Sequence, residues 1–103
     1  MSTQITHDFV NSIDDLRIFI HTTLCAKENL LAEQFEMTEM TLIKRGRYCG
    51  LQFSLQGPRS VRLGAIWAAD QNVIYFYDAR GERYQKIRLP RRVHLPSHEQ
   101  QVA

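Results

Sequence analysis

A run of basic residues over positions 80–92 has the clearest chemical potential in this sequence. Tyr84 lies within the run, and further cations stand one predicted hairpin earlier. Guanidinium and ammonium groups contact phosphates, and exposed aromatic rings give bases a surface for stacking. The resulting candidate surface for nucleic acid consists of Arg59, Arg62, Arg83, Tyr84, Lys86 and Arg88. The alternative interpretation is a solvated last strand whose charges protect it from pairing with other strands.

A shallow trough is the second candidate site. Tyr48, Gln52 and Ser54 stand at alternate positions of one predicted strand, so they share a face with Gly50. Gly64 falls on the same face of the next strand. Because glycine has no side chain, Gly50 and Gly64 would leave a shallow hollow with polar walls between the strands. Such a hollow suits a small anion or a peptide. The alternative is that both glycines relieve crowding where the sheet bends or bulges.

Metal ligands are present in the sequence but do not form a complete set. His21 and Cys25 are four residues apart on a predicted helix, and Cys49 is a candidate third ligand from the core side of a strand. His94 and His98 stand near the C-terminal end without neighbouring acids or thiols. Buried free thiols explain the cysteines more simply. The sequence therefore predicts no metal site and no cofactor.

An enzyme is the least supported of the function classes. Asp70, Asp78, Glu82 and the histidines are candidate general acids or bases, but Asp70 and Asp78 occur where short polar side chains cap turns. No glycine-rich phosphate loop and no nucleophile motif accompanies them. We therefore expect a protein without catalytic residues.

The first element that must position these residues is a helix. Ser12 is placed to cap the N–H of Asp15, and both Asp14 and Asp15 favour the positive end of a helix. Apolar residues then recur at intervals of three and four. This spacing predicts a helix from Ile13 to about Leu30 with one buried face.

After the helix, the apolar residues alternate with period two. Turn residues divide this part of the chain into predicted strands near residues 38–45, 47–56, 61–68, 73–78 and 82–89. The connections are so short that neighbouring strands must pair antiparallel. Gly46 suits the first position of a type II′ turn, and Gly81 suits a left-handed position in a longer loop.

These elements predict an α+β domain in which one N-terminal helix packs on a five-stranded antiparallel meander sheet. The predicted core is Leu16, Ile20, Leu24, Leu51, Phe53, Leu63 and Trp67. The middle strands are apolar on both faces, and one helix covers only one of them. The other face is covered either by curling of the sheet toward a barrel or by a second copy in a homodimer.

A single domain accounts for the whole of this chain. Its 103 residues are 44% hydrophobic and 23% charged, typical of a globular domain that needs neither metal nor disulfide. We predict a domain over residues 1–89, with a short lead-in to about residue 11, and a flexible tail over residues 90–103. The start lacks the features of a secretory signal and no run is long enough to span a membrane, so we expect a cytoplasmic protein.

The charge of the chain is small in total but divided along the sequence. Residues 1–43 contain two basic and seven acidic residues, a net charge of −5. Residues 44–103 contain eleven basic and four acidic residues, a net charge of +7. Such a division could steer an anionic partner toward one side of the molecule, provided that folding does not mix the two halves.

Several segments resemble a family of small uncharacterised bacterial proteins. The resemblance spans roughly residues 15–89 and rests on five segments: Cys49–Phe53 (CGLQF), Gly57–Leu63 (GPRSVRL), Ala65–Trp67 (AIW), Phe76–Asp78 (FYD) and Gly81–Arg83 (GER). It implies a self-contained bacterial domain and brings no catalytic residue, cofactor or substrate. It also implies that Arg59, Arg62, Trp67 and Arg83 are the first residues to test for binding.

Three functions therefore remain open at this point. The first is a binding or interaction module that associates with itself through an apolar sheet face, or captures another protein. The second is a nucleic-acid-binding module that uses the basic residues of the third and fifth predicted strands. The third is a small enzyme.

Overall fold

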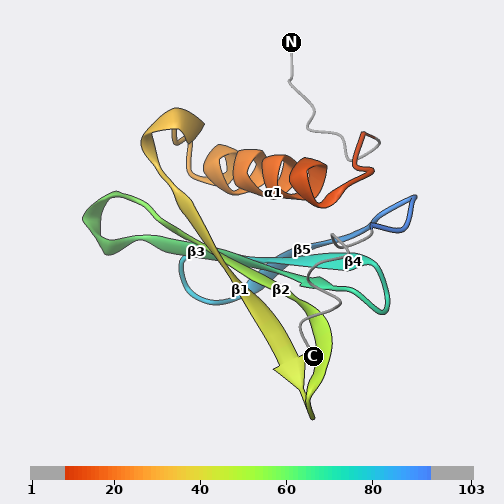
Figure 1. Cartoon of the computed structure of the whole chain (residues 1–103). Coiled ribbons are helices and arrows are strands. Elements are labelled where there is room, and N and C mark those ends of the chain that lie inside the picture. Colours follow the sequence, from red (N-terminus) through yellow and green to blue (C-terminus); the bar gives the residue numbers. More distant parts are fainter. Residues whose placement is uncertain (1–8, 94–103) are drawn as a thin grey trace.

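The computed structural model describes residues 9–93 and has one helix lying across one face of a five-stranded antiparallel sheet (Figure 1). Its elements are α1 (Ile13–Lys27), η1 (Ala32–Gln34), β1 (Met37–Lys44), β2 (Arg47–Gln56), η2 (Pro58–Ser60), β3 (Arg62–Ala68), β4 (Val73–Tyr77) and β5 (Arg83–Arg88). Each strand pairs with its neighbour in sequence, so the spatial order is β1-β2-β3-β4-β5. The predicted α+β meander is confirmed. The sheet is open rather than closed into a barrel, with β1 and β5 at its edges.

Helix α1 begins as predicted and ends earlier than predicted. The Ser12 hydroxyl accepts a hydrogen bond from the N–H of Asp15 at 3.1 Å. The helix ends at Lys27 because Asn29 adopts a left-handed conformation with φ 57°. The N–H of Leu30 then donates back to a carbonyl of the last helical turn at 2.8 Å, which closes the helix as a C-terminal cap.

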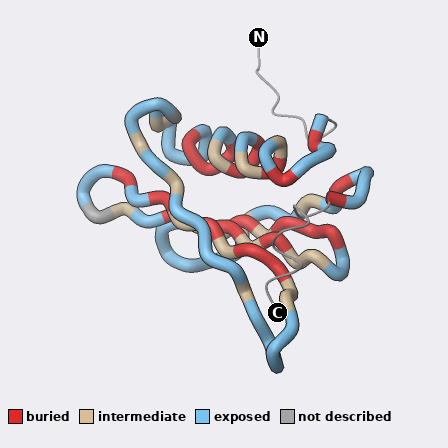
Figure 2. Tube along the Cα trace, viewed as in Figure 1, coloured by how far each residue is buried: buried red, intermediate tan, exposed pale blue. Residues whose placement is uncertain are grey.

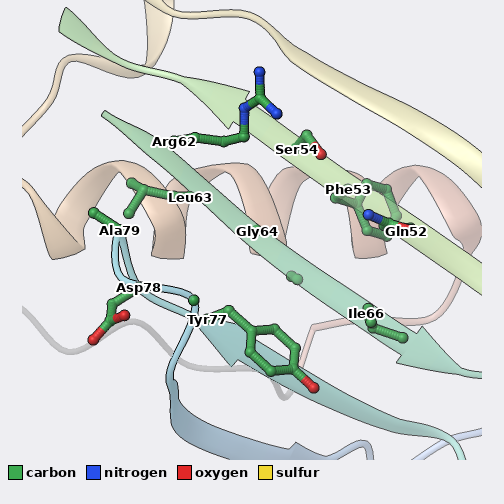
Figure 3. Close-up of a pocket in the computed structure, with 12 residues that line it drawn as sticks. Gln52, Phe53, Ser54, Arg62, Leu63, Gly64, Ile66, Tyr77, Asp78 and Ala79 are labelled. Atoms are coloured by element: carbon green, nitrogen blue, oxygen red, sulfur yellow. The ribbon is translucent and has the colours of Figure 1, made fainter. Parts of the chain in front are cut away.

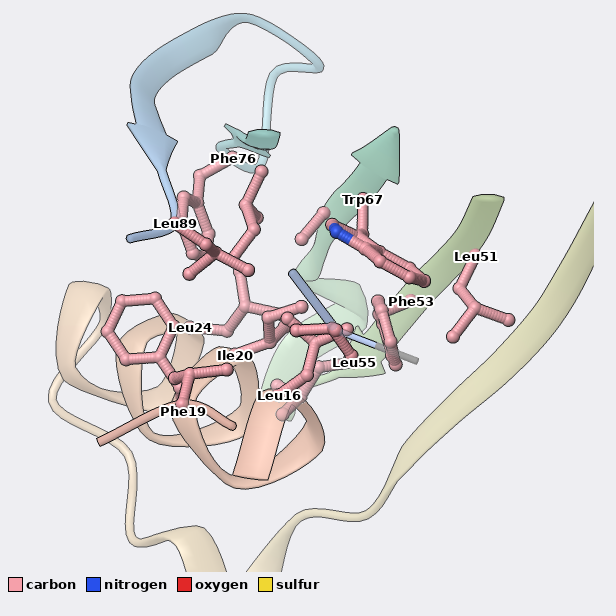
Figure 4. Close-up of a cluster of buried hydrophobic side chains, with 14 of the residues drawn as sticks. Leu16, Phe19, Ile20, Leu24, Leu51, Phe53, Leu55, Trp67, Phe76 and Leu89 are labelled. Carbon is pink, nitrogen blue, oxygen red and sulfur yellow. The ribbon is translucent and has the colours of Figure 1, made fainter. Parts of the chain in front are cut away.

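The hydrophobic core lies between α1 and the sheet face that α1 covers. Figure 4 shows helix residues such as Leu16 and Ile20 packed against strand residues such as Phe53 and Trp67. All seven predicted core residues are at most 3% exposed. Burial of each large apolar side chain contributes about 1.5–3 kcal/mol, so this layer supplies most of the favourable free energy of folding. Figure 2 shows the buried residues gathered on the central strands and the facing side of the helix.

Both ends of the described chain pack into this core. Val10 is 0% exposed, and Leu89 and Val93 are 5% and 4% exposed. Val10 lies in the predicted lead-in and Leu89 at the predicted end of the domain, whereas Val93 lies beyond that end and still packs into the core. Residues 94–103 of the predicted flexible tail, with His94 and His98, lie outside the described residues.

The β1–β2 hairpin has a different turn from the one expected. Arg45 and Gly46 form its two-residue loop between the paired Lys44 and Arg47, with φ of 55° and 75°. Positive φ at both central positions is the type I′ pattern, so the predicted type II′ turn with Gly46 in first place is wrong. Gly81 does have the predicted left-handed conformation, with φ 82°.

A β-bulge interrupts the same hairpin. Leu42 is opposite Gly50 and Ile43 is opposite Tyr48, so no residue of β1 lies directly opposite Cys49 in the strand pairing. The extra residue turns Tyr48 to the helix side of the sheet, where its ring centroid lies 6.5 Å from that of Trp67.

Candidate binding face of the sheet

The sheet face opposite α1, here called the outer face, has no helix or strand of the described chain over it. Residues that are directly opposite on paired antiparallel strands share a face, so the register assigns the outer residues. One row across the sheet consists of Met40, Gln52, Ile66, Tyr75 and Lys86. The next row consists of Thr38, Ser54, Gly64, Tyr77 and Arg83.

Arg83 and two tyrosines form a cluster on the β4–β5 side of this face. The Arg83 guanidinium carbon lies 4.2 Å from the ring centroid of Tyr75 and 5.6 Å from that of Tyr77. The same guanidinium donates a hydrogen bond to the Tyr77 hydroxyl at 3.2 Å. Lys86 places its ammonium nitrogen 5.9 Å from the Tyr75 ring. Cation–π attraction holds these groups as a flat, positively charged aromatic cluster.

The outer face is strongly basic. Arg62, Arg83, Lys86 and Arg88 point outward from β3 and β5 and are all exposed. Among the described strand residues on this face, none is acidic. Among residues 9–43, the acidic residues lie instead on α1 (Asp14 and Asp15), on the connection from α1 to β1 (Glu28, Glu33 and Glu36) and on the helix side of β1 (Glu39). On the described strands, the outer face therefore carries basic charge without acidic charge.

An open depression of about 280 Å³ lies beside the aromatic cluster. Figure 3 shows it with α1 behind the strands, so it belongs to the outer face. Gln52 and Ser54 line one wall, Gly64 the floor and Tyr77 the opposite wall, with Arg62 at one end. Of the residues predicted for the trough, Gln52, Ser54 and Gly64 line this depression. Gly50 does not line it, and the bulge turns Tyr48 to the other face.

The glycines of the predicted trough have different roles. A Cβ atom on Gly50 would lie 2.1 Å from the carbonyl oxygen of Trp67, so close approach of β3 requires glycine there. A Cβ atom on Gly64 would meet only the Phe53 carbonyl oxygen, at 3.4 Å. Gly50 therefore fits the structural alternative, whereas Gly64 leaves open space in the depression.

Asp78 is the carboxylate at the edge of the depression, and it caps a turn. Its Oδ1 accepts hydrogen bonds from the backbone N–H groups of Arg80 and Glu82, each at 3.0 Å. The bond from Glu82 is the main reason why the pKa of Asp78 lies below its usual value. The carboxylate is thereby held in its ionised form as a turn cap, and no histidine or cysteine lines the depression beside it.

Tyr84 does not belong to the basic outer face, although the sequence placed it there. Its ring packs 6.2 Å from that of Phe76 on the helix side, with the Lys27 ammonium nitrogen 4.5 Å from its centroid. A register shift between Phe76 and Tyr77 causes this change of face. Burial raises the pKa of Tyr84 to about 12. A stacking role for Tyr84 on the basic face is therefore wrong.

The other predicted cations lie at different places on the molecule. Arg62 is the first residue of β3, opposite Gln56, and Arg88 is the last residue of β5, opposite Val73. Arg59 is exposed in η2, with a left-handed φ of 58°, and is not among the residues that line the depression. The structure thus brings Arg62, Arg83, Lys86 and Arg88 to one face.

The candidate metal ligands have structural partners. His21 Nε2 lies 2.7 Å from the carbonyl oxygen of Phe35, on the connection that follows α1. Cys25 is 2% exposed in the core, and the Cys49 thiol donates to the Leu42 carbonyl at 3.3 Å. Within residues 9–93, no three histidine, cysteine, aspartate or glutamate side chains are grouped to hold a metal ion.

Tyr75 and Tyr77 are the residues that the sequence did not single out for the site. The segment Val73–Tyr77 is apolar throughout, so its alternation does not tell which side faces α1. A usable signal was present, because tyrosine carries a polar hydroxyl and occurs here at alternate positions, whereas Ile74 and Phe76 have none.

Three comparisons bear on the identity of the chain. No family model, no curated protein and no solved structure matches it. In the part of the chain that the structure describes, no helix combines the length and apolar character needed to cross a bilayer. The conclusions about function therefore depend on the geometry of the outer face.

Proposed function

We propose that this protein is a binding module for single-stranded nucleic acid and that the outer face is its binding surface. The observation that supports the proposal is the composition of that face: four exposed cations, two partly buried tyrosines and no acidic residue on the described strands. An open antiparallel sheet with this combination offers phosphate contacts and stacking surfaces together.

The geometry of the cluster suits bases rather than phosphates alone. Tyr75 and Tyr77 stand on alternate residues of β4, so their rings follow one another along a single strand. The Arg83 guanidinium lies over the Tyr75 ring and near the Tyr77 ring, so it presents its own plane above the tyrosines. Bases stack on guanidinium planes as well as on aromatic rings. The depression beside Tyr77, with its amide and hydroxyl groups, is placed to receive an unstacked base or a sugar.

A homodimer packed through the same face is the competing proposal, and the charges oppose it. A two-fold interface places the same patch of both copies together. Here that would bring two sets of four cations into contact without any acidic strand residue to neutralise them. Like charges brought together cost several kcal/mol. The outer face therefore fits an anionic partner better than a second copy of itself.

The test is fluorescence anisotropy with labelled mixed-sequence single strands of DNA and RNA, titrated from about 50 to 200 mM salt. Four phosphate contacts predict a slope of about −3 in a plot of log affinity against log salt, since each contact in a single strand contributes about 0.7. Arg83→Gln should make that slope less steep by about 0.7. Tyr75→Leu should weaken binding by about 1–3 kcal/mol with the slope unchanged.

The matched control is Lys27→Gln, which removes an exposed cation from the helix side of the sheet. It should leave affinity and salt slope as in the wild type. Absence of binding at the lowest salt would overturn the proposal, as would equal effects of Lys27→Gln and Arg83→Gln. Circular dichroism of each variant confirms that the fold is retained.

A further inference from the structure

The free edge of β1 differs from that of β5. Six of the eight residues of β1 are exposed, and its charges are Glu39, which is paired with Arg17 of α1, and the terminal Lys44. Strand β5 instead carries Arg83, Lys86 and Arg88 in six residues. Charges along an edge prevent pairing with other chains, and a long uncharged edge invites it. The sheet is therefore protected at β5 and open to a further strand at β1.

The exposed apolar side chains also point to β1. Met40 is 62% exposed and Ile43 is 66% exposed, and both lie on this strand. The strand has no proline, and threonine and branched apolar residues make up half of it. Such residues favour extended backbone. A strand added at this edge would cover both apolar side chains.

We propose that the added strand is β1 of a second copy, paired antiparallel about a two-fold axis at Met40. The axis stands perpendicular to the sheet, so outer residues meet outer residues and the two five-stranded sheets become one sheet of ten strands. The pairs in this register are Met40 with its own copy, Glu39 with Thr41, Thr38 with Leu42, and Met37 with Ile43.

This register is complementary in charge as well as in apolar contacts. It continues to Glu36, the exposed residue before β1, which falls opposite Lys44 of the second copy. Symmetry gives this ion pair twice. The neighbouring register centred on Thr41 still places Met40 opposite Leu42, but it puts Ile43 opposite Glu39 and Lys44 opposite Thr38, so it loses the apolar contact of Ile43 and the ion pair of Lys44. The Met40 register is therefore the one that the residues of this edge support.

The dimer is independent of the proposed nucleic-acid binding, because β1 contributes none of the four cations of the outer face. The dimer nevertheless has one consequence for the proposed nucleic-acid binding. A two-fold axis perpendicular to the sheet leaves both outer faces on the same side. The two basic surfaces then face the same way, toward opposite ends of the ten-stranded sheet, so one strand of nucleic acid would have to cross the dimer to contact both.

The first test is sedimentation equilibrium of the full chain, with the wild type expected at twice the 12.1 kDa monomer mass. Met40→Lys places two lysines opposite each other at the axis and should raise the dimer Kd roughly tenfold or more. Ile18→Lys is the matched control, since Ile18 is 57% exposed on α1 away from the edge, and it should leave the Kd unchanged. A monomeric wild type, or equal effects of the two variants, overturns the proposal.

The register has its own test by charge reversal. Glu36→Lys and Lys44→Glu each create two like-charged pairs and should each weaken the dimer, whereas the double variant restores opposite charges and should recover wild-type Kd. Additive weakening in the double variant would overturn the Met40 register. Met40→Cys should also form an interchain disulfide on mild oxidation, because residues facing each other on an axis have Cα atoms about 4.5–5.5 Å apart. Ile18→Cys should not.

Discussion

The indole N–H of Trp67 donates a hydrogen bond to the side-chain oxygen of Asn72 across 3.1 Å. The Asn72 side-chain nitrogen donates to the Arg91 carbonyl at 2.6 Å, and its backbone carbonyl accepts the N–H of Leu89 at 3.0 Å. Asn72 is 7% exposed and adopts a left-handed φ of 56°. One turn residue therefore joins the core tryptophan, the β3–β4 turn and the segment that follows β5.

Removal of this side chain should destabilise the protein. Asn72→Gly leaves the buried indole N–H of Trp67 without its acceptor and should lower the free energy of unfolding by about 1–3 kcal/mol. Asn72→Ala should cost about 1–2 kcal/mol more, because alanine resists the left-handed conformation. Urea unfolding of both variants measures the two effects separately. Equal stability of the alanine and glycine variants would contradict the conformational part of this argument.

The glycines of the outer face should differ in their tolerance of a methyl group. Gly50→Ala brings Cβ against the Trp67 carbonyl oxygen, so the backbones of β2 and β3 must separate. We expect a loss of about 1–3 kcal/mol, as for other overpacked sites. Gly64→Ala meets one atom at 3.4 Å and should change the free energy of unfolding by less than about 1 kcal/mol. Thermal unfolding of the pair provides the comparison, and a more damaging Gly64→Ala would contradict it.

The ion pair between Arg17 and Glu39 should couple α1 to β1. Arg17 donates from Nε and Nη2 to the two carboxylate oxygens of Glu39, at 2.8 and 2.9 Å. The side chains are 37% and 29% exposed, so solvent screens the pair. A double-mutant cycle with Arg17→Met and Glu39→Gln should give a coupling of about 0.5–1 kcal/mol.

The salt dependence of the coupling between Arg17 and Glu39 shows whether it is electrostatic or comes from apolar packing. The coupling between Arg17 and Glu39 should fall as ionic strength rises, since screening weakens exposed ion pairs. A coupling that persists unchanged in high salt would show that the side chains act through apolar contact instead.

The Tyr84 hydroxyl is buried and has no hydrogen-bond partner among the described residues. Tyr84→Phe removes an unsatisfied polar group and keeps the ring against Phe76, so stability should be equal to or greater than that of the wild type. The substitution should also change how the free energy of unfolding depends on pH in alkaline solution. Because burial raises the folded-state pKa to about 12, above about 10 in the unfolded chain, ionisation favours unfolding as pH rises between these values.

Unfolding free energies of wild type and Tyr84→Phe between pH 9 and pH 11 test this linkage. The wild type should lose stability over the upper part of the range, and the phenylalanine variant should lose less. Tyr77→Phe is the control, since Tyr77 lies on the outer face and its hydroxyl already accepts a hydrogen bond from Arg83. Identical pH profiles for wild type and Tyr84→Phe would contradict the assignment.

Features that depend only on residues close together in the sequence could be predicted from it. The cap at Ser12 and the alternation of β2 and β3 are local, because a helix needs a hydrogen-bonding side chain at its start and a strand buries every second residue. The predicted core followed from the same periodicities. The four cations of the outer face were also among the predicted site residues, since Arg62 alternates with the apolar residues of β3 and the other three belong to the basic run over residues 80–92.

Errors occurred where the pairing of two strands decides the outcome. At the bulge, Cys49 is an extra residue of β2 between the two residues that pair with Leu42 and Ile43 of β1. The local sequence of β2 does not reveal this extra residue, because the pairing with β1 creates it. The register shift between Phe76 and Tyr77 likewise moves Tyr84 to the helix side of the sheet. Each irregularity moves a tyrosine across the sheet, so both aromatic residues predicted for the site were wrong. Tyr75 and Tyr77 were missed because every residue of β4 is apolar or aromatic.

The sequential order of the strands has a consequence for how the chain folds. The loops between paired strands are two to five residues long, so each pairing closes a small ring and costs little chain entropy. Contacts between near neighbours in sequence go with fast folding. The packing of α1 on the strands is an exception, and so are Val10 and Val93, which enter the same hydrophobic cluster from opposite ends of the described chain. We expect Val10 and Val93 to dock after the hairpins have formed, so shortening either side chain should speed unfolding and leave the folding rate nearly unchanged.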